Sequence, residues 1–164
     1  MSIEEILDVV GELDCELVEV TGGEPLAQEE VGQLVQALLD AEKEVLVETG
    51  GHMDIDLVSR ESIRIMDIKC PASKMSHKND YKNIEKLTPQ DEIKFVIQNK
   101  EDFLWAEKII REYKLEKKCK LIMSTVFGVM NRQELAELIL ESGLKIRMQV
   151  QLHKLIWSED SKGV

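Results

Sequence analysis

The stretch Leu17-Val18-Glu19-Val20-Thr21-Gly22-Gly23-Glu24-Pro25 decides the fold class of this chain. An apolar run typical of a strand ends in paired glycines and an acid. These residues place bare backbone and one carboxylate at the carboxyl end of the strand. In α/β proteins ligands bind at that end of the sheet. A Gly-Gly turn between a strand and a helix is more often simple turn chemistry. Its interpretation therefore depends on the rest of the chain.

Strand-like and helix-like segments alternate along the sequence. Helical patterns cover about 2–13, 31–39, 103–110 and 131–141, and residues 71–90 are expected to form a polar loop. Six runs read as strands, namely 16–20, 44–48, 63–68, 93–97, 120–124 and 146–150. This alternation predicts one α/β domain over residues 1–164. We expect five predominantly parallel strands, aligned with right-handed helical crossovers.

Polar or glycine-rich residues follow several of the predicted strands. They lie at 21–25, 48–52, 67–71 and 124–125. Each segment alone is explained by turn chemistry, but the carboxyl ends of parallel strands share one edge, so together they predict a binding rim. One flank of the sheet is expected to be an exposed strand edge beside apolar surface. Such an edge predicts dimerisation or poor solubility.

The charge of the chain is unevenly distributed. Residues 1–62 contain 17 acidic and two basic residues, a formal charge of −15, whereas the rest of the chain carries +4 and the total is −11. This balance argues against a nucleic-acid-binding surface. The acidic first third is explained either as a solvated face or as a surface facing a basic segment that this chain lacks.

Targeting signals and metal-binding patterns are missing from the sequence. No apolar stretch approaches the roughly 20 residues that span a bilayer, and the N-terminus lacks a signal-peptide core. The three cysteines, Cys15, Cys70 and Cys119, are far apart, which is typical of a cytoplasmic protein without disulfides. We interpret them as buried structural thiols. The three histidines lack metal-ligand spacing, and no phosphate-binding loop is present.

Four segments taken together resemble one enzyme family, 7-carboxy-7-deazaguanine synthase. That family belongs to the radical S-adenosylmethionine enzymes and acts in queuosine and 7-deazapurine biosynthesis. The resemblance covers essentially the whole chain, and the segments 92–97 and 162–164 look like the same family. The four segments are Thr21-Gly22-Gly23-Glu24-Pro25-Leu26, Val47-Glu48-Thr49-Gly50-Gly51, Asp67-Ile68-Lys69-x-Pro71 and Gln151-Leu152-His153-Lys154-x-x-Trp157.

The resemblance implies a fold, a set of cofactors and a reaction. The fold would be a partial parallel β/α barrel that binds S-adenosylmethionine, a 4Fe–4S cluster and Mg²⁺. The enzyme is a lyase that converts 6-carboxy-5,6,7,8-tetrahydropterin to 7-carboxy-7-deazaguanine with loss of ammonia. Reductive cleavage of S-adenosylmethionine at the cluster yields a deoxyadenosyl radical, which abstracts a substrate hydrogen. The protein would orient and shield these groups.

The resemblance also assigns site residues by motif. Substrate would be held by Thr21 and by the chain terminus, Val164. No residue of this chain is assigned to catalysis or to a metal, and His153 and Trp157 are expected to serve packing. S-adenosylmethionine would be held by Gly22, Gly23, Glu24, Asp67, Ile68, Lys69, Ser124, Thr125, Val126 and Phe127. Within this set, Glu24 is expected to meet the amino group of the ligand.

The sequence departs from the family at the cluster. The family binds iron through Cys-x-x-x-Cys-x-x-Cys, which this chain does not contain. The chain is therefore expected to be an N-terminally truncated barrel that acts as a homodimer or with a partner segment bearing those cysteines. The alternative is a non-catalytic module that binds S-adenosylmethionine or a pterin.

Overall fold

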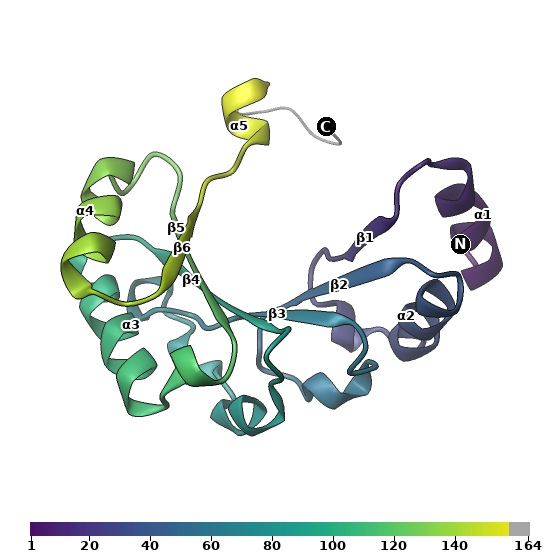
Figure 1. The fold of residues 1–164 in the computed structure, drawn as a ribbon, viewed down its shortest axis with the longest axis horizontal. Helices are drawn as coiled ribbons and strands as arrows, with labels where there is room; N and C mark the ends of the chain where they lie inside the picture. Colours follow the sequence, from purple (N-terminus) through teal and green to yellow (C-terminus); the bar gives the residue numbers. More distant parts are fainter. Residues whose placement is uncertain (158–164) are drawn as a thin grey trace.

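Six parallel strands form one open sheet in the computed structural model, which describes residues 1–157 (Figure 1). The strands follow one another across the sheet in chain order, each hydrogen-bonded to the next. The expected α/β class and parallel sheet are confirmed, and the expected count of five strands is one too low. The strands are β1 Leu17–Val20, β2 Glu44–Thr49, β3 Ile63–Asp67, β4 Glu92–Ile97, β5 Lys120–Thr125 and β6 Ile146–Gln149.

Among the described residues, four helices cover the convex side of a crescent-shaped sheet, and the concave side is open (Figure 1). They are α1 Ile3–Glu12, α2 Val31–Asp40, α3 Lys100–Glu112 and α4 Arg132–Ser142. The short α5 His153–Ile156 follows β6 at the end of one arm, beside the opening (Figure 1). Ser2 begins α1 with the capping box that its sequence predicts. Because β1 and β6 do not meet, the sheet is a partial barrel and not a closed one.

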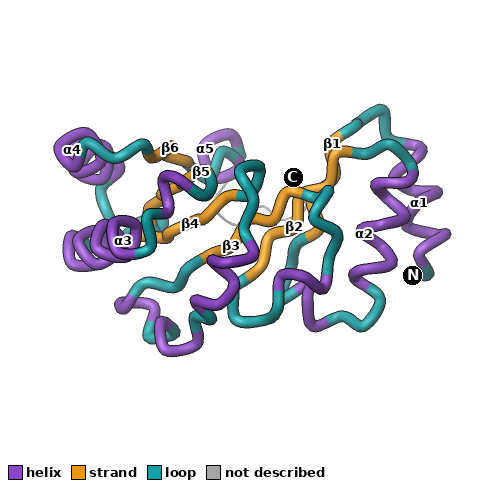
Figure 2. The backbone as a smooth tube through the Cα atoms, turned by 60° about the horizontal axis from the view of Figure 1, so that its bottom comes forward, coloured by secondary structure: helices purple, strands orange, loops and turns teal. Residues whose placement is uncertain are grey.

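Two of the crossovers differ from the expected helical form. The connections from β2 to β3 and from β3 to β4 contain only short 3₁₀ segments, which Figure 2 shows between the strands. The second of these covers the expected polar loop, and it is more ordered than a plain loop. The three segments there are Pro71–Ser73, Ser76–Lys78 and Tyr81–Lys86. Buried Asn83 anchors this connection because its side-chain amide binds the backbone carbonyls of Gly51 and Met53.

The core lies between the sheet and its outer helices. Along β2 every second residue is buried, which directs Val45 and Val47 toward the helices. The alternate positions, Leu46 and Glu48, face the concave side of the crescent. This period-2 alternation is a general property of strands. The open side of the barrel is therefore lined by alternate residues of the strands, apolar ones such as Leu46 and Ile65 as well as charged ones such as Glu48.

The three cysteine thiols are not all buried, contrary to the prediction. Cys70 is buried and Cys119 is partly buried, but Cys15 is exposed in the connection from α1 to β1. The prediction that Cys15 is a buried structural thiol is therefore wrong, because α1 ends at Glu12 and leaves the following turn in solvent. None of the helices among the described residues is long and apolar enough to cross a membrane.

Candidate functional site

The loops that follow β1, β2 and β3 meet around a cavity of about 330 Å³ at the carboxyl edge of the sheet. We call it the glycine cavity. The shared edge predicted for these three segments is therefore confirmed. The cavity is lined by Thr21, Gly22, Gly23, Glu24, Glu48, Thr49, Gly50, His52, Asp67, Lys69, Met75 and Lys78.

Two glycines keep one wall of this cavity open. Gly22 and Gly23 have φ angles of +96° and +56°, in the left-handed region that residues with a Cβ rarely adopt. A Cβ built on either residue would meet no atom within 4 Å. The backbone conformation therefore requires glycine, and the space beside both residues is free for a ligand.

Glu24 is occupied by protein partners. Its Oε1 accepts hydrogen bonds from Thr49 Oγ1 at 2.8 Å and from Leu26 N at 3.1 Å. Its Oε2 accepts one from Gly50 N at 2.8 Å and lies 3.5 Å from His52 Nδ1. The carboxylate thus joins the loop after β1 to the loop after β2. This geometry favours a positioning role for Glu24 over the expected contact with a ligand amino group.

Asp67 and Lys69 form the opposite wall. Lys69 Nζ donates to Asp67 Oδ2 at 2.6 Å, and the Asn79 side chain fixes the Lys69 backbone through both its N–H and its carbonyl. The second oxygen of Asp67, Oδ1, is buried and has no hydrogen-bond partner among residues 1–157. A buried acceptor without a partner is costly, so this oxygen can accept from a further donor. Ile68, between the two, packs in the core and does not line the cavity.

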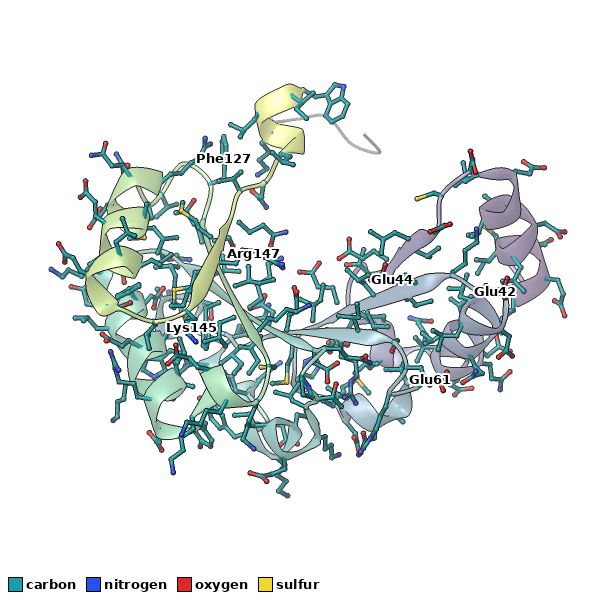
Figure 3. All side chains as sticks on the ribbon, viewed as in Figure 1. Glu42, Glu44, Glu61, Phe127, Lys145 and Arg147 are labelled. Carbon is teal, nitrogen blue, oxygen red and sulfur yellow. The ribbon has the colours of Figure 1, made fainter. Side chains whose placement is uncertain are left out.

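A second cavity of about 660 Å³ lies on the concave face of the sheet. We call it the sheet cavity. Ser124, Thr125, Val126 and Phe127 line it, so the predicted S-adenosylmethionine residues are divided between two cavities. Phe127 lies at the top of the β5 arm beside α5 (Figure 3). Lys154 Nζ sits over its ring at 4.6 Å, a cation–π contact.

Charged side chains of both signs line the sheet cavity. Its acidic half carries Glu19 of β1 and Glu48 of β2. Its other half carries Lys94 and Glu92 of β4 and Arg147 of β6. Figure 3 places Arg147 on the arm opposite β2. Arg147 Nη2 donates to Glu92 Oε2 at 2.7 Å at the base of the cavity.

Glu19 and Glu48 carry most of the negative charge of this cavity. Burial and the neighbouring Glu48 carboxylate raise the pKa of Glu19, while Lys94 acts in the opposite direction. Glu48 Oε1 accepts from Lys94 Nζ at 2.5 Å, and its Oε2 accepts from Thr21 Oγ1 at 3.4 Å. Thr21, predicted to hold substrate, therefore lies where the two cavities meet.

The binding rim predicted from the sequence contains Glu48 but misses Glu19, Lys94 and Arg147. All four are charged side chains within predicted strands. That placement is itself a signal, because the alternation of a strand puts them on one face. Val164, the second predicted substrate residue, lies outside the described residues.

The described residues do not form an iron or magnesium site. Cys15, Cys70 and Cys119 lie in three separate connections, and no group of three His, Cys, Asp or Glu residues within 1–157 is arranged to hold a metal. Burial, with smaller contributions from nearby carboxylates, raises the pKa of the Cys70 thiol, and burial raises that of Cys119 to about 12. In the absence of a metal these two groups are therefore protonated thiols.

Comparison with known proteins finds relatives that share one name. The 7-carboxy-7-deazaguanine synthase of Chlorobaculum tepidum is 40% identical over the whole chain, which covers 76% of that protein. The protein of the same name from Koribacter versatilis is 38% identical over 90% of the chain and 72% of its own length. That from Thermoplasma acidophilum is 31% identical over 96% of the chain. The chain belongs to the 7-carboxy-7-deazaguanine synthase family.

Membership of the 7-carboxy-7-deazaguanine synthase family confirms the resemblance drawn from the four segments. No family model matches the chain, so the assignment rests on the individual relatives. The chain spans about three quarters of the length of the 7-carboxy-7-deazaguanine synthases from Chlorobaculum and Koribacter. The open six-stranded sheet is consistent with the partial barrel that the resemblance implies.

Proposed function

We propose that this chain provides the ligand cavities of a 7-carboxy-7-deazaguanine synthase, which converts 6-carboxy-5,6,7,8-tetrahydropterin to 7-carboxy-7-deazaguanine with loss of ammonia. The observation that carries the proposal is identity of up to 40% along the whole chain to enzymes of that name. The geometry is compatible with it. Two cavities meet at Glu48 on the carboxyl edge of the sheet, where α/β proteins bind small molecules.

The glycine cavity fits S-adenosylmethionine. The buried Asp67 Oδ1 lacks a donor, which a ribose hydroxyl or an ammonium of that molecule would supply. Lys69 and Lys78 bring positive charge to the same cavity and would balance the ligand carboxylate. The open wall at Gly22 and Gly23 lets the ligand approach the backbone. When bound, S-adenosylmethionine supplies the deoxyadenosyl group of the family reaction.

The 4Fe–4S cluster and Mg²⁺ do not fit the described residues, whose cysteines are dispersed. No step of the proposal runs through either group. The chain's own side chains bind, orient and shield the organic ligands. Glu19, Glu48, Lys94 and Arg147 present charges of both signs to the sheet cavity. A pterin, which has a hydrogen-bonding ring edge and a carboxylate, matches such a divided surface.

Calorimetry tests the glycine cavity without requiring turnover. We expect the chain alone to bind S-adenosylmethionine weakly, because metal and charge-assisted contacts dominate small polar sites and no cluster is available to the ligand. Asp67→Ala should abolish this binding, whereas Ser73→Ala, outside the cavity lining, should not. Absence of any heat at millimolar S-adenosylmethionine would reject the cavity as a ligand site and leave the family membership intact.

A fusion tests the reaction itself. The chain alone should show neither the brown colour of an iron–sulfur protein nor turnover of the pterin. A segment carrying Cys-x-x-x-Cys-x-x-Cys, fused to the chain or supplied as a second chain, should restore both. The matched control replaces the three added cysteines by alanine. A fusion that assembles the cluster and binds S-adenosylmethionine but forms no 7-carboxy-7-deazaguanine would reject the enzyme in favour of a non-catalytic module.

A second outcome would overturn the interpretation of the native thiols. If anaerobic reconstitution of the chain alone gives a stoichiometric 4Fe–4S spectrum, then Cys15, Cys70 and Cys119 are not merely structural. The expected partner is either a second copy of the chain or a separate segment that carries the cysteines.

Light scattering on the chain, alone and mixed with that segment as a second chain, distinguishes a homodimer from a complex with the segment.

A further inference from the structure

Glu48 occupies a special position in the site. Among residues 1–157 it is the one side chain that lines both the glycine cavity and the sheet cavity. It is the penultimate residue of β2, and Thr49 separates it from Gly50 and Gly51 of the following turn. The orientation of its carboxylate therefore shapes the wall of both cavities.

Lys94 reaches Glu48 across an intervening strand. Glu48 pairs in register with Ile65 of β3, and β3 in turn pairs with β4, where Lys94 lies opposite Asp67. The lysine side chain must therefore extend over β3 to place Nζ 2.5 Å from Glu48 Oε1. Both side chains are partly shielded, with exposed fractions of 21% for Lys94 and 28% for Glu48. Such a pair interacts more strongly than one on the open surface, although it keeps part of its solvation.

The surroundings of this pair are rich in carboxylates. Lys94 also acts on Glu19 of β1. Burial and the Glu48 carboxylate raise the pKa of Glu19, and the Lys94 ammonium lowers it. One ammonium therefore balances two carboxylates in the acidic half of the sheet cavity. The other ionisable groups that line the two cavities are Glu24, His52, Asp67, Lys69, Lys78, Glu92, Arg147 and Lys154.

We propose that Lys94 is a positioning residue: with Thr21 on the other oxygen, its ammonium fixes the Glu48 carboxylate in the wall between the two cavities. Both carboxylate oxygens of Glu48 are then held. The carboxylate therefore keeps a constant orientation toward the ligand of each cavity. The inference rests on the proposed function only in taking the cavities as ligand sites. The simpler explanation, an ion pair that merely stabilises the sheet, predicts a different set of results.

The first test is independent of ligands and of turnover. Carboxyl-carbon NMR follows the titration of Glu19 in the chain and in three variants. Lys94→Met keeps the length of the side chain and removes its charge, so it should raise the pKa of Glu19. Lys94→Arg should restore the original value, and Glu48→Gln should lower it because a neighbouring negative charge is lost. An unchanged Glu19 titration in Lys94→Met would overturn the proposal.

Thermal unfolding separates positioning from stability. Because the pair is partly solvated, Lys94→Met should change Tm by less than about 2 °C. A fall of more than about 5 °C, restored by Lys94→Arg, would assign Lys94 to the stability of the sheet and overturn the proposal.

The second test uses the cysteine-bearing fusion. Lys94→Met should raise KM for the pterin about tenfold with a smaller change in kcat, and Lys94→Arg should stay within about threefold of the unsubstituted fusion. Wild-type kinetics in Lys94→Met would overturn the proposal. If the unsubstituted fusion shows no turnover at all, the proposed function fails, and the Glu19 titration together with the Tm comparison still tests the role of Lys94.

Discussion

At the scale of the residue, Glu24 joins two loops. Three of its hydrogen bonds come from Leu26, Thr49 and Gly50, at 2.8 to 3.1 Å, and its side chain is only 12% exposed. A carboxylate with this set of partners contributes to stability and holds the two loops in place. The cavity depends on it because the loop after β1 and the loop after β2 are its two walls.

We therefore expect Glu24→Ala to lower the free energy of unfolding by about 1–3 kcal/mol, since the buried Thr49 hydroxyl and the partly buried Gly50 N–H lose their acceptor. Urea denaturation of the chain measures this change. Thr21→Val is the matched control, because Thr21 is exposed and makes one long hydrogen bond of 3.4 Å. Equal stability of Glu24→Ala and Thr21→Val would argue against the positioning role of Glu24.

The ion pair between Arg64 and Asp91 is the most deeply buried of the described residues. Arg64 Nη2 donates to Asp91 Oδ2 at 2.6 Å and Nε donates to Oδ1 at 3.1 Å, with both side chains fully buried. Burial acts to raise the pKa of Asp91, but hydrogen bonds from Arg64 and Thr88 outweigh it and lower the pKa. Stability from this carboxylate is present above its unfolded pKa of about 3.9 and is lost as the pH falls through the lower folded value.

Asp91→Asn should destabilise the chain by about 3–5 kcal/mol at pH 7, because it leaves the Arg64 guanidinium buried without a counter-charge. The difference from the unsubstituted chain should shrink below about pH 4. Urea denaturation at several pH values measures both effects. Asp56→Asn provides the control, since Asp56 meets the same arginine at 3.4 Å but is 35% exposed. A pH-independent difference would contradict the role of the Asp91 charge.

At the scale of the element, the packing of α2 against the segment that follows β2 depends on one glycine. A Cβ on Gly32 would lie 2.6 Å from the carbonyl oxygen of Leu57, a backbone atom that cannot move aside. Gly11 of α1, in contrast, has no neighbour within 4 Å of such a Cβ. The two helices are of equal length, so the two glycines form a natural pair for comparison.

Gly11→Ala should stabilise the chain by about 0.5–1 kcal/mol, as alanine does in an open helix position. Gly32→Ala should instead destabilise it by about 1–3 kcal/mol, because the clash forces α2 away from Leu57. Thermal unfolding of the two variants reports the sign of each change. A stabilised Gly32→Ala variant would show that α2 can shift without cost.

At the scale of the whole molecule, the sheet ends in two strands that have a neighbour on one side only. On the β1 side, Val9, Leu13 and Leu17 are about half exposed, and no residue of α1 is buried. An unpaired strand edge beside apolar surface favours association with another chain. The strong negative charge of residues 1–62 would select a basic partner surface or limit self-association at low salt.

We expect the chain to dimerise at high concentration, more strongly as added salt screens the acidic surface. Small-angle scattering over a concentration series, at low and high salt, measures this association. Leu17→Lys places a charge on the β1 edge and should return the chain to a monomer. A monomer under all conditions would count against an interface at this edge.

The sequence by itself determined the order of elements, the parallel sheet, the carboxyl-edge site and the family. These properties follow from local information: the alternation of apolar residues, capping pairs such as Ser2 and Glu5, and glycines that a turn requires. Motif matching also named Thr21, the glycines and Lys69, which the structure brings to one cavity.

Only the tertiary structure decided which side chains act together. The separation of segment 124–127 from the glycine cavity follows from strand order, because β5 lies two strands beyond β3 in the sheet. The Glu48–Lys94 pair joins residues 46 positions apart across an intervening strand, and the partners of Glu24 lie in another loop. Such contacts depend on strand order and register, which are properties of the assembled sheet. For that reason the pairing of the charged side chains in the site could be determined only from the arrangement of the six strands in the sheet.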